Sequence, residues 1–277
     1  MIQKVNLLLF AIVAGLFCCP SLLVAGASGQ QKDGYFISLK PYYYETDQYF
    51  DESGNLKDRG GTFKKYEMNI YAEYGLTENY TLTLNTFYNW LTDDASGVKQ
   101  KNHGLADQEI GLQRIVAKGN HGTTAIHGML IVPGGYSLKD QPRLGYDRFG
   151  AEIAILHGNS FMMLDRYGFF DLRLGYRGYS GYPSSQIRVN ADVGYDISSR
   201  WQILASGELH YGLKDGYVEQ VEDSSPVQPN YRLLKITLAA RFRINEHSSL
   251  VFGGYRHAWG EDAGGGGGGY VSLWLTN

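Results

Sequence analysis

The sequence predicts an all-β fold: a transmembrane antiparallel up-and-down β-barrel of about 12 strands, with short periplasmic turns and long outer loops. Three observations lead to this fold. Apolar and polar residues alternate along many segments, and the connections between these segments are alternately long and short. The 277-residue chain also combines 36 glycines with 22 tyrosines, a composition that weakens helix interiors but suits pleated surfaces.

The first 27 residues have the organisation of a signal peptide. Lys4 precedes an apolar stretch from Val5 to Phe17, and Ala25-Gly26-Ala27 supplies the small residues that precede a cleavage site. The apolar stretch is short for a membrane-spanning helix. We therefore expect residues 1–27 to be a signal peptide cleaved after Ala27, and residues 28–277 to form the outer-membrane β-barrel. Both cysteines would leave with the signal peptide, so the exported chain would contain no thiol.

The segment from Lys65 to Tyr74 shows the alternation clearly. One face would carry Tyr66, Met68, Ile70, Ala72 and Tyr74, and the other Lys65, Glu67, Asn69, Tyr71 and Glu73. A period of two residues predicts a strand with one apolar and one polar face. The same pattern, applied along the chain, predicts strands at 34–46, 63–74, 79–91, 104–117, 122–132, 148–158, 168–179, 186–196, 200–213, 231–243, 248–259 and 268–276.

The connections between the predicted strands distinguish the two ends of the barrel. Four of the five connections expected on the periplasmic side are tight turns, and the fifth, 159–167, is longer. The outer connections include 47–62 and 133–147. An even number of strands places both chain ends on the periplasmic side. The six consecutive glycines at 264–269 are expected to form a flexible loop at the start of the last strand.

A soluble β-sandwich is the alternative, because its strands also alternate. Three features favour the barrel. The apolar faces begin and end in aromatic residues, as at Tyr66 and Tyr74 or Tyr80 and Trp90, which suits the aromatic girdles at the two membrane interfaces. The polar faces carry charges deep within the strands, where a wet lumen tolerates them. The predicted strands are also longer than is usual in globular sheets.

The charged residues of the polar faces are expected to line the lumen. The residues that we expect along a solute path are Glu67, Asp107, Glu109, Glu152, Asp171, Arg173, Arg177, Arg188, Asp192, Glu208 and Arg241; Lys40, Lys65, Glu73, His210, Lys235, Arg243 and Arg256 share these faces. Two interpretations stay open. The acidic residues of the early strands and the arginines of the later ones could form opposed arcs that orient polar solutes, or the charges could pair and brace the barrel.

Residues 104–112, Gly-Leu-Ala-Asp-Gln-Glu-Ile-Gly-Leu, resemble the Gly-Leu-Gly-Asp-x-Glu-x-x-Leu strand opening of bacterial outer-membrane barrels of the MetA phenol-degradation-pathway transporter type and the related XagA type. Ala106 stands in place of the second glycine. Residues 170–177 and 181–191 extend the likeness to the XagA type, and the similar region runs from Tyr66 to Tyr211. The resemblance implies an outer-membrane channel connected with exopolysaccharide export or with uptake of small organic molecules.

Together these features lead us to expect a channel in the outer membrane of a Gram-negative bacterium. Small organic solutes or an extended polysaccharide chain would pass passively through its charged lumen. Its partners would be outer-membrane lipid and the solute, while the sequence identifies no periplasmic partner. A formal net charge of −3 without a lysine- or arginine-rich run argues against nucleic acid as a partner.

Two other classes of function were weighed against a channel. No cofactor motif, metal-ligand spacing or Gly-x-Ser-x-Gly motif occurs, so we expect no cofactor, no metal and no enzyme activity. The one His-x-Ser match of a lipid-modifying hydrolase, His247-Ser248-Ser249, falls at a tight turn expected on the periplasmic side. A structural or adhesive barrel could instead bind a partner through the acidic outer loops 47–61 and 214–229.

Overall fold

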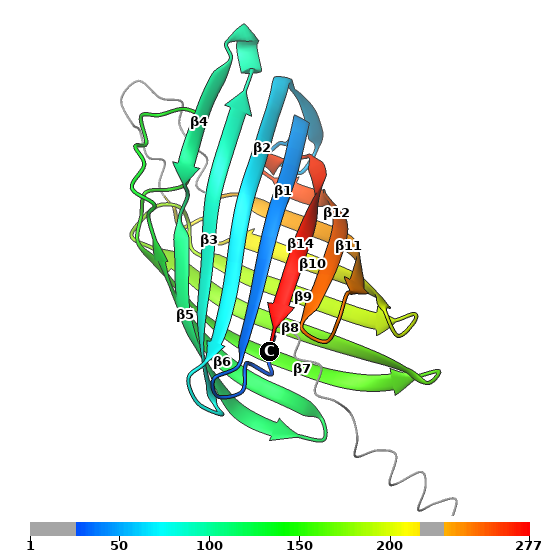
Figure 1. The fold of residues 1–277 in the computed structure, drawn as a ribbon. Coiled ribbons are helices and arrows are strands. Elements are labelled where there is room, and N and C mark those ends of the chain that lie inside the picture. The colour runs from blue at the N-terminus through cyan, green and yellow to red at the C-terminus, as the bar shows by residue number, and fades with distance from the viewer. Residues whose placement is uncertain (1–25, 217–229) are drawn as a thin grey trace, which may run out of the picture.

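The computed structural model describes residues 26–216 and 230–277 and shows a closed antiparallel β-barrel (Figure 1). Most strands pair with their neighbours in sequence, and the pairing of β1 with both β2 and β14 closes the sheet. Segments β4 and β5 both pair with β3, while β13 and β14 both pair with β1, so the fourteen segments make a wall of 12 strands. No helix in the described part of the chain is both long and apolar enough to cross a bilayer.

The elements follow one another around the wall. They are β1 (Tyr35–Phe50), β2 (Leu56–Gly75), β3 (Tyr80–Asp93), the 3₁₀-helix η1 (Ala95–Gly97), β4 (Gln100–Leu105), β5 (Gln108–Gly119), β6 (Gly122–Val132), β7 (Gly150–Met163), β8 (Arg166–Tyr179), β9 (Gln186–Asp196), β10 (Trp201–Gly212), β11 (Arg232–Arg243), β12 (Ser248–Glu261), β13 (Ala263–Gly264) and β14 (Gly267–Thr276). The all-β barrel expected from the sequence is therefore confirmed.

All five connections at the periplasmic end are tight turns, and the C-terminus lies at the same end (Figure 1). The longer connection expected at 159–167 is wrong, because β7 continues to Met163 and β8 begins at Arg166. The loop expected at 47–62 is also shorter than predicted. Gln48 and Tyr49 still pair with Asp58 and Lys57 there. The two strands continue to pair through their backbones in this hairpin, but their side chains no longer alternate between apolar and polar. The strand prediction depended on that alternation and therefore ended too early.

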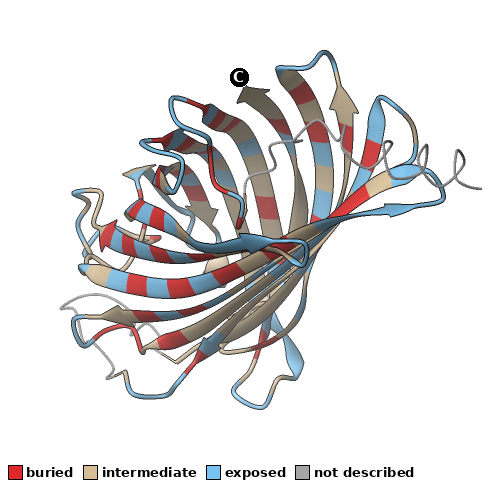
Figure 2. Cartoon of the chain, turned by 90° about the horizontal axis from the view of Figure 1, so that it is seen from below, coloured by how far each residue is buried: buried red, intermediate tan, exposed pale blue. Residues whose placement is uncertain are grey.

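The alternation of the sequence separates two surfaces of the wall, visible as bands of buried and exposed residues along several strands (Figure 2). The outer face carries the predicted apolar residues. Tyr66 is 57% exposed, and Ile236 is 47% exposed. Trp90 and Trp201 are exposed on the same face. The structure thus places the aromatic residues expected in the membrane girdles on the outside of the barrel.

The glycine run does not form the flexible loop that the sequence predicts. Gly267, Gly268 and Gly269 belong to β14 and pair with β1. A Cβ atom added to Gly268 would lie 1.9 Å from the carbonyl oxygen of Tyr43. The glycines therefore allow the backbones of β14 and β1 to approach closely. Composition alone does not distinguish this role from flexibility.

Candidate solute path in the barrel lumen

Four of the expected path residues form one buried ionic cluster on β5, β7 and β8. Glu152 and Arg177 are direct register partners on β7 and β8, and Arg177 Nε lies 2.6 Å from Glu152 Oε2. Arg177 Nη2 also lies 2.7 Å from Glu109 Oε1. Arg173 Nε donates to the other oxygen of Glu152 at 3.1 Å. Two carboxylates and two guanidinium groups thus satisfy one another across the inner face.

The cluster extends to residues that were not expected on the path. His127 Nδ1 lies 2.9 Å from Arg173 Nη2, and its Nε2 lies 2.9 Å from the Thr83 hydroxyl. Asn85 donates to Glu109 at 2.9 Å. The inward parity of the predicted strands already contained these positions. The alternation marks these positions as inward, but it does not show which neutral side chains bind the charged ones.

Other inward charges pair in the same way. Lys65 Nζ lies 2.8 Å from Glu67 Oε2, and Lys235 forms an ion pair with Glu208, its register partner. The opposed acidic and basic arcs considered from the sequence are therefore wrong for these residues, because each carboxylate lies beside a cation. Glu208 has its cation on the neighbouring strand, and Glu67 has its cation two residues away on β2. The pairing interpretation holds for them.

Two further arginines of the expected path form hydrogen bonds with other side chains of the inner wall. Arg188 Nε donates to Gln186 at 3.1 Å, and its Nη2 lies 3.4 Å from His210. Arg241 donates to Ser249 at 3.0 Å, and its guanidinium carbon lies 5.2 Å from the centre of the Trp274 ring.

Arg256 does not line the lumen and is exposed on the outer face of β12. The parity of this strand was assigned wrongly, because Tyr255 resembles a lipid-facing residue. Tyr255 instead points inward and is 7% exposed. Its hydroxyl oxygen would lie 2.8 Å from a Cβ atom added to Gly268. The glycine on the neighbouring strand thus makes room for an inward tyrosine.

Asp107 lies between β4 and β5 and fastens the outer connection 133–149 to the barrel mouth. Its carboxylate accepts hydrogen bonds from the hydroxyl of Tyr136 and, at 3.1 Å, from the backbone N–H of Tyr146. Burial raises the pKa of Tyr136, as does its hydrogen bond to Asp107. Leu144 of the same connection is buried. This outer connection therefore packs against the mouth of the barrel rather than standing free of it.

The chain that precedes β1 lies against the inner wall at the periplasmic end. The N–H of Ala27 donates to Asp171 at 3.0 Å, and Gln113 donates to the carbonyl of Gly26 at 3.0 Å. Further along this stretch, Gln30 is buried, with 1% of its surface exposed. Its side-chain amide donates a hydrogen bond to the carboxylate of Glu73 at 2.6 Å. We call residues 26–34 the N-terminal segment. Residues 1–25 of the expected signal peptide lie outside the described residues, as does most of the outer loop 214–229.

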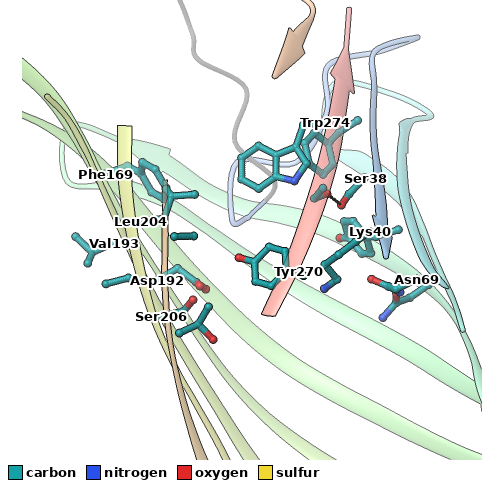
Figure 3. Close-up of a pocket in the computed structure, with 17 residues that line it drawn as sticks. Ser38, Lys40, Asn69, Phe169, Asp192, Val193, Leu204, Ser206, Tyr270 and Trp274 are labelled. Carbon is teal, nitrogen blue, oxygen red and sulfur yellow. Dashed lines mark hydrogen bonds between the residues drawn. The ribbon is translucent and has the colours of Figure 1, made fainter. Parts of the chain in front are cut away.

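Three cavities lie inside the barrel. An outer vestibule of about 910 Å³ lies beside the outer connection and includes Leu144 and Tyr146 in its lining. An inner chamber of about 350 Å³ lies between β1 and β14 on one side and β8 to β11 on the other (Figure 3). A third cavity of about 400 Å³ is bounded by the N-terminal segment and shares Lys40, Tyr71 and Asp192 with the chamber.

A stack of tyrosines runs along the inner wall between the vestibule and the chamber. The rings of Tyr42 and Tyr255 are 4.6 Å apart and nearly parallel, at 15°. Tyr270 extends this stack toward the chamber, and Tyr44 extends it toward the vestibule. Lys40 and Lys65 approach the ring of Tyr42, with Nζ at 5.9 and 5.2 Å from its centre. The lumen therefore combines aromatic faces with cations, a property that the sequence pattern did not indicate.

Comparison with known proteins supports the fold. No family model and no curated protein matches the sequence. The crystal structure of an outer membrane channel from Pseudomonas putida F1 superposes with a TM-score of 0.70 at 13% identity, covering 92% of this chain and 100% of that chain. The translocator domain of the autotransporter NalP from Neisseria meningitidis gives a TM-score of 0.48 at 12% identity, covering 99% of this chain and 95% of that chain. The likeness to the Pseudomonas channel shows that the chain has the fold of an outer-membrane β-barrel.

Proposed function

We propose that this protein is an outer-membrane channel through which small organic solutes pass passively. The presence of three cavities inside a closed barrel carries this proposal. Their volumes, from about 350 to about 910 Å³, lie in the range of sites that hold small ligands. These volumes favour a small solute over an extended polysaccharide chain.

The proposal includes the route by which the chain reaches the membrane. Residues 1–27 would be removed as a signal peptide on export from the cytoplasm of a Gram-negative bacterium, leaving 28–277 as the barrel. The outward aromatic residues support insertion into a bilayer, because tyrosine and tryptophan favour the membrane interfaces. The resemblance to the MetA and XagA types, which rests on residues 104–112, 170–177 and 181–191, supports transport as the role of this barrel.

In this proposal the lumen is narrowed at both ends. The N-terminal segment narrows the periplasmic end through the contacts of Ala27 and Gln30 with the wall. The outer connection 133–149 narrows the mouth through Asp107. The paired charges between these two points would keep the path polar without presenting one sign of charge to the solute.

A lipid-modifying hydrolase is the less favoured alternative. His247 lies in the periplasmic turn between β11 and β12. The serine of the His-x-Ser match, Ser249, is 2% exposed, and its hydroxyl accepts a hydrogen bond from Arg241 Nε at 3.0 Å. Its neighbour Ser248 donates to Asn245 at 2.9 Å within the turn. The motif serine is thus buried and bound to Arg241, which gives no support to a serine nucleophile at this motif. A structural or adhesive barrel is the other alternative, and it would need no open lumen.

Conductance distinguishes the channel from both alternatives. The protein, refolded in detergent and inserted into a planar bilayer, should give discrete current steps in potassium chloride. Liposomes that contain it should swell in solutions of small sugars or amino acids but not of dextran. A membrane that conducts no better with the folded protein than without it would overturn the channel and favour a structural barrel. Heat-modifiable migration in a denaturing gel shows that the barrel is folded in each preparation.

A further inference from the structure

The inner chamber contains two opposite charges that the wall leaves without an ionic partner. Lys40 on β1 and Asp192 on β9 face each other across it (Figure 3). In contrast to the paired residues described above, neither forms an ion pair with another described residue. Lys40 contacts the ring faces of Tyr42 and Tyr270, and Asp192 accepts a hydrogen bond from Ser206. A cation and a carboxylate are thus both available to a solute.

The chamber is also polarised along the barrel axis. Phe36 and Trp274 lie near the periplasmic ends of β1 and β14, and their rings are 5.5 Å apart at 72°. Phe169 and Leu204 line the facing wall, from β8 and β10. Lys40 lies further from the periplasmic end of β1 than Phe36 does. The apolar side chains therefore gather at the periplasmic end of the chamber, and the two charges lie deeper in the barrel.

We propose that this chamber binds zwitterionic α-amino acids that carry an aromatic or large apolar side chain. The carboxylate of the solute would pair with Lys40 and its ammonium group with Asp192. Its side chain would lie among Phe36, Phe169 and Trp274. Two separate charges of opposite sign favour a zwitterion over a simple acid or amine, because either of those would leave one buried charge beside a like or a neutral group.

The place of the two charges fits this role in transport. Lys40 and Asp192 line both the chamber and the cavity bounded by the N-terminal segment. A solute held between them would thus stand where the chamber meets the cavity bounded by the N-terminal segment. This inference rests on the proposed channel function and names the class of solute that the channel takes.

Calorimetric titration of the full-length barrel in detergent micelles tests the inference without requiring transport. The probes are L-phenylalanine, 3-phenylpropionate, which lacks the ammonium group, and 2-phenylethylamine, which lacks the carboxylate. We expect L-phenylalanine to bind at least about tenfold more tightly than either analogue, since charge-assisted hydrogen bonds contribute this much or more. Lys40→Met and Asp192→Asn should each weaken its binding by at least about tenfold.

A loss of preference for the zwitterion, with binding of one analogue retained, separates this role from a merely structural one. Asp192→Asn should bring 3-phenylpropionate level with L-phenylalanine, and Lys40→Met should do the same for 2-phenylethylamine. Misfolding would abolish binding of all three probes and would not leave one analogue bound as before. Lys118→Met and Asp165→Asn, at exposed sites on β5 and in the turn between β7 and β8, are matched controls that should bind L-phenylalanine as the parent protein does.

The outcomes separate this inference from the channel itself. A protein that conducts in a planar bilayer but binds no L-phenylalanine would overturn the inference and leave the channel standing. Equal binding of L-phenylalanine and 3-phenylpropionate by the parent protein would also overturn it. Binding with the expected preference by a barrel that conducts no current would support the site while overturning the channel.

Discussion

Glu152 and Arg177 face each other across β7 and β8 and form an ion pair whose side chains are 1% and 6% exposed. Their burial makes this pair the structural centre of the inner wall. The guanidinium group of Arg177 also reaches Glu109, so one cation compensates two carboxylates on different strands. The pair thereby links β5, β7 and β8 through side chains as well as through the backbone.

Replacing Arg177 should destabilise the barrel strongly. Arg177→Met leaves Glu109 without its cation and Glu152 with Arg173 alone, and breaking a buried ion pair costs about 3–5 kcal/mol. Urea unfolding of the micelle-refolded protein, followed by tryptophan fluorescence, measures the loss in the free energy of unfolding. Arg166→Met on the exposed end of β8 is the matched control and should change this free energy by less than about 0.5 kcal/mol. Equal stability of the two variants would contradict a bracing role for the pair.

Loosening the N-terminal segment should widen the periplasmic end of the lumen. Gln30 lies beyond the expected cleavage site and is held by the Thr81 hydroxyl at 2.9 Å and by Glu73 at 2.6 Å. The double substitution Gln30→Ala, Thr81→Val removes these hydrogen bonds, so single-channel conductance should rise. Gln100→Ala, at an exposed position on β4, is the control and should conduct as the parent does. Conductance that stays at the parent value would show that the segment does not limit the current.

A methyl group at Gly253 should disturb the tyrosine stack. Gly253 on β12 is opposite Tyr270 on β14, and a Cβ atom added there would lie 2.3 Å from the Tyr270 ring. Gly253→Ala should therefore lower the free energy of unfolding by ~1–3 kcal/mol, the usual cost of overpacking. At Gly128 on β6 an added Cβ meets nothing within 4 Å, so Gly128→Ala should be nearly neutral. The same urea titration compares the two, and equal losses would show that ring contact is not the cause.

The turn between β1 and β2 should loosen in acid. The backbone N–H of Asn55, and then that of Ser53, donate to Asp51 and lower the pKa of its carboxyl below the usual 3.8. The charged form is thus favoured in the folded turn. Its contribution is fully present above pH 3.8 and is lost as the pH falls through the lowered value. Amide hydrogen exchange at Ser53 and Asn55 should show this loss, and Asp51→Asn should remove the pH dependence.

The sequence by itself determined the strands of the barrel wall and, with the exception of β12, the face that the charged strands turn outward. Strands 122–132 and 186–196 match β6 and β9 at both ends. Both properties follow from a two-residue period and from local turns, which neighbouring residues encode. Beyond the lipid-facing part of the wall, as in the outer hairpin of β1 and β2, the two-residue alternation ends, so the sequence no longer predicts the strand.

Only the tertiary structure decided which inward charges form ion pairs and which do not. Arg177 meets Glu109 across a sequence separation of 68 residues, whereas Lys40 and Asp192 face each other without pairing. The inward position of Tyr255 and the course of the N-terminal segment along the inner wall were likewise not evident from the sequence. Each depends on the register of distant strands and on closure of the barrel, since these fix which side chains come within reach across the lumen.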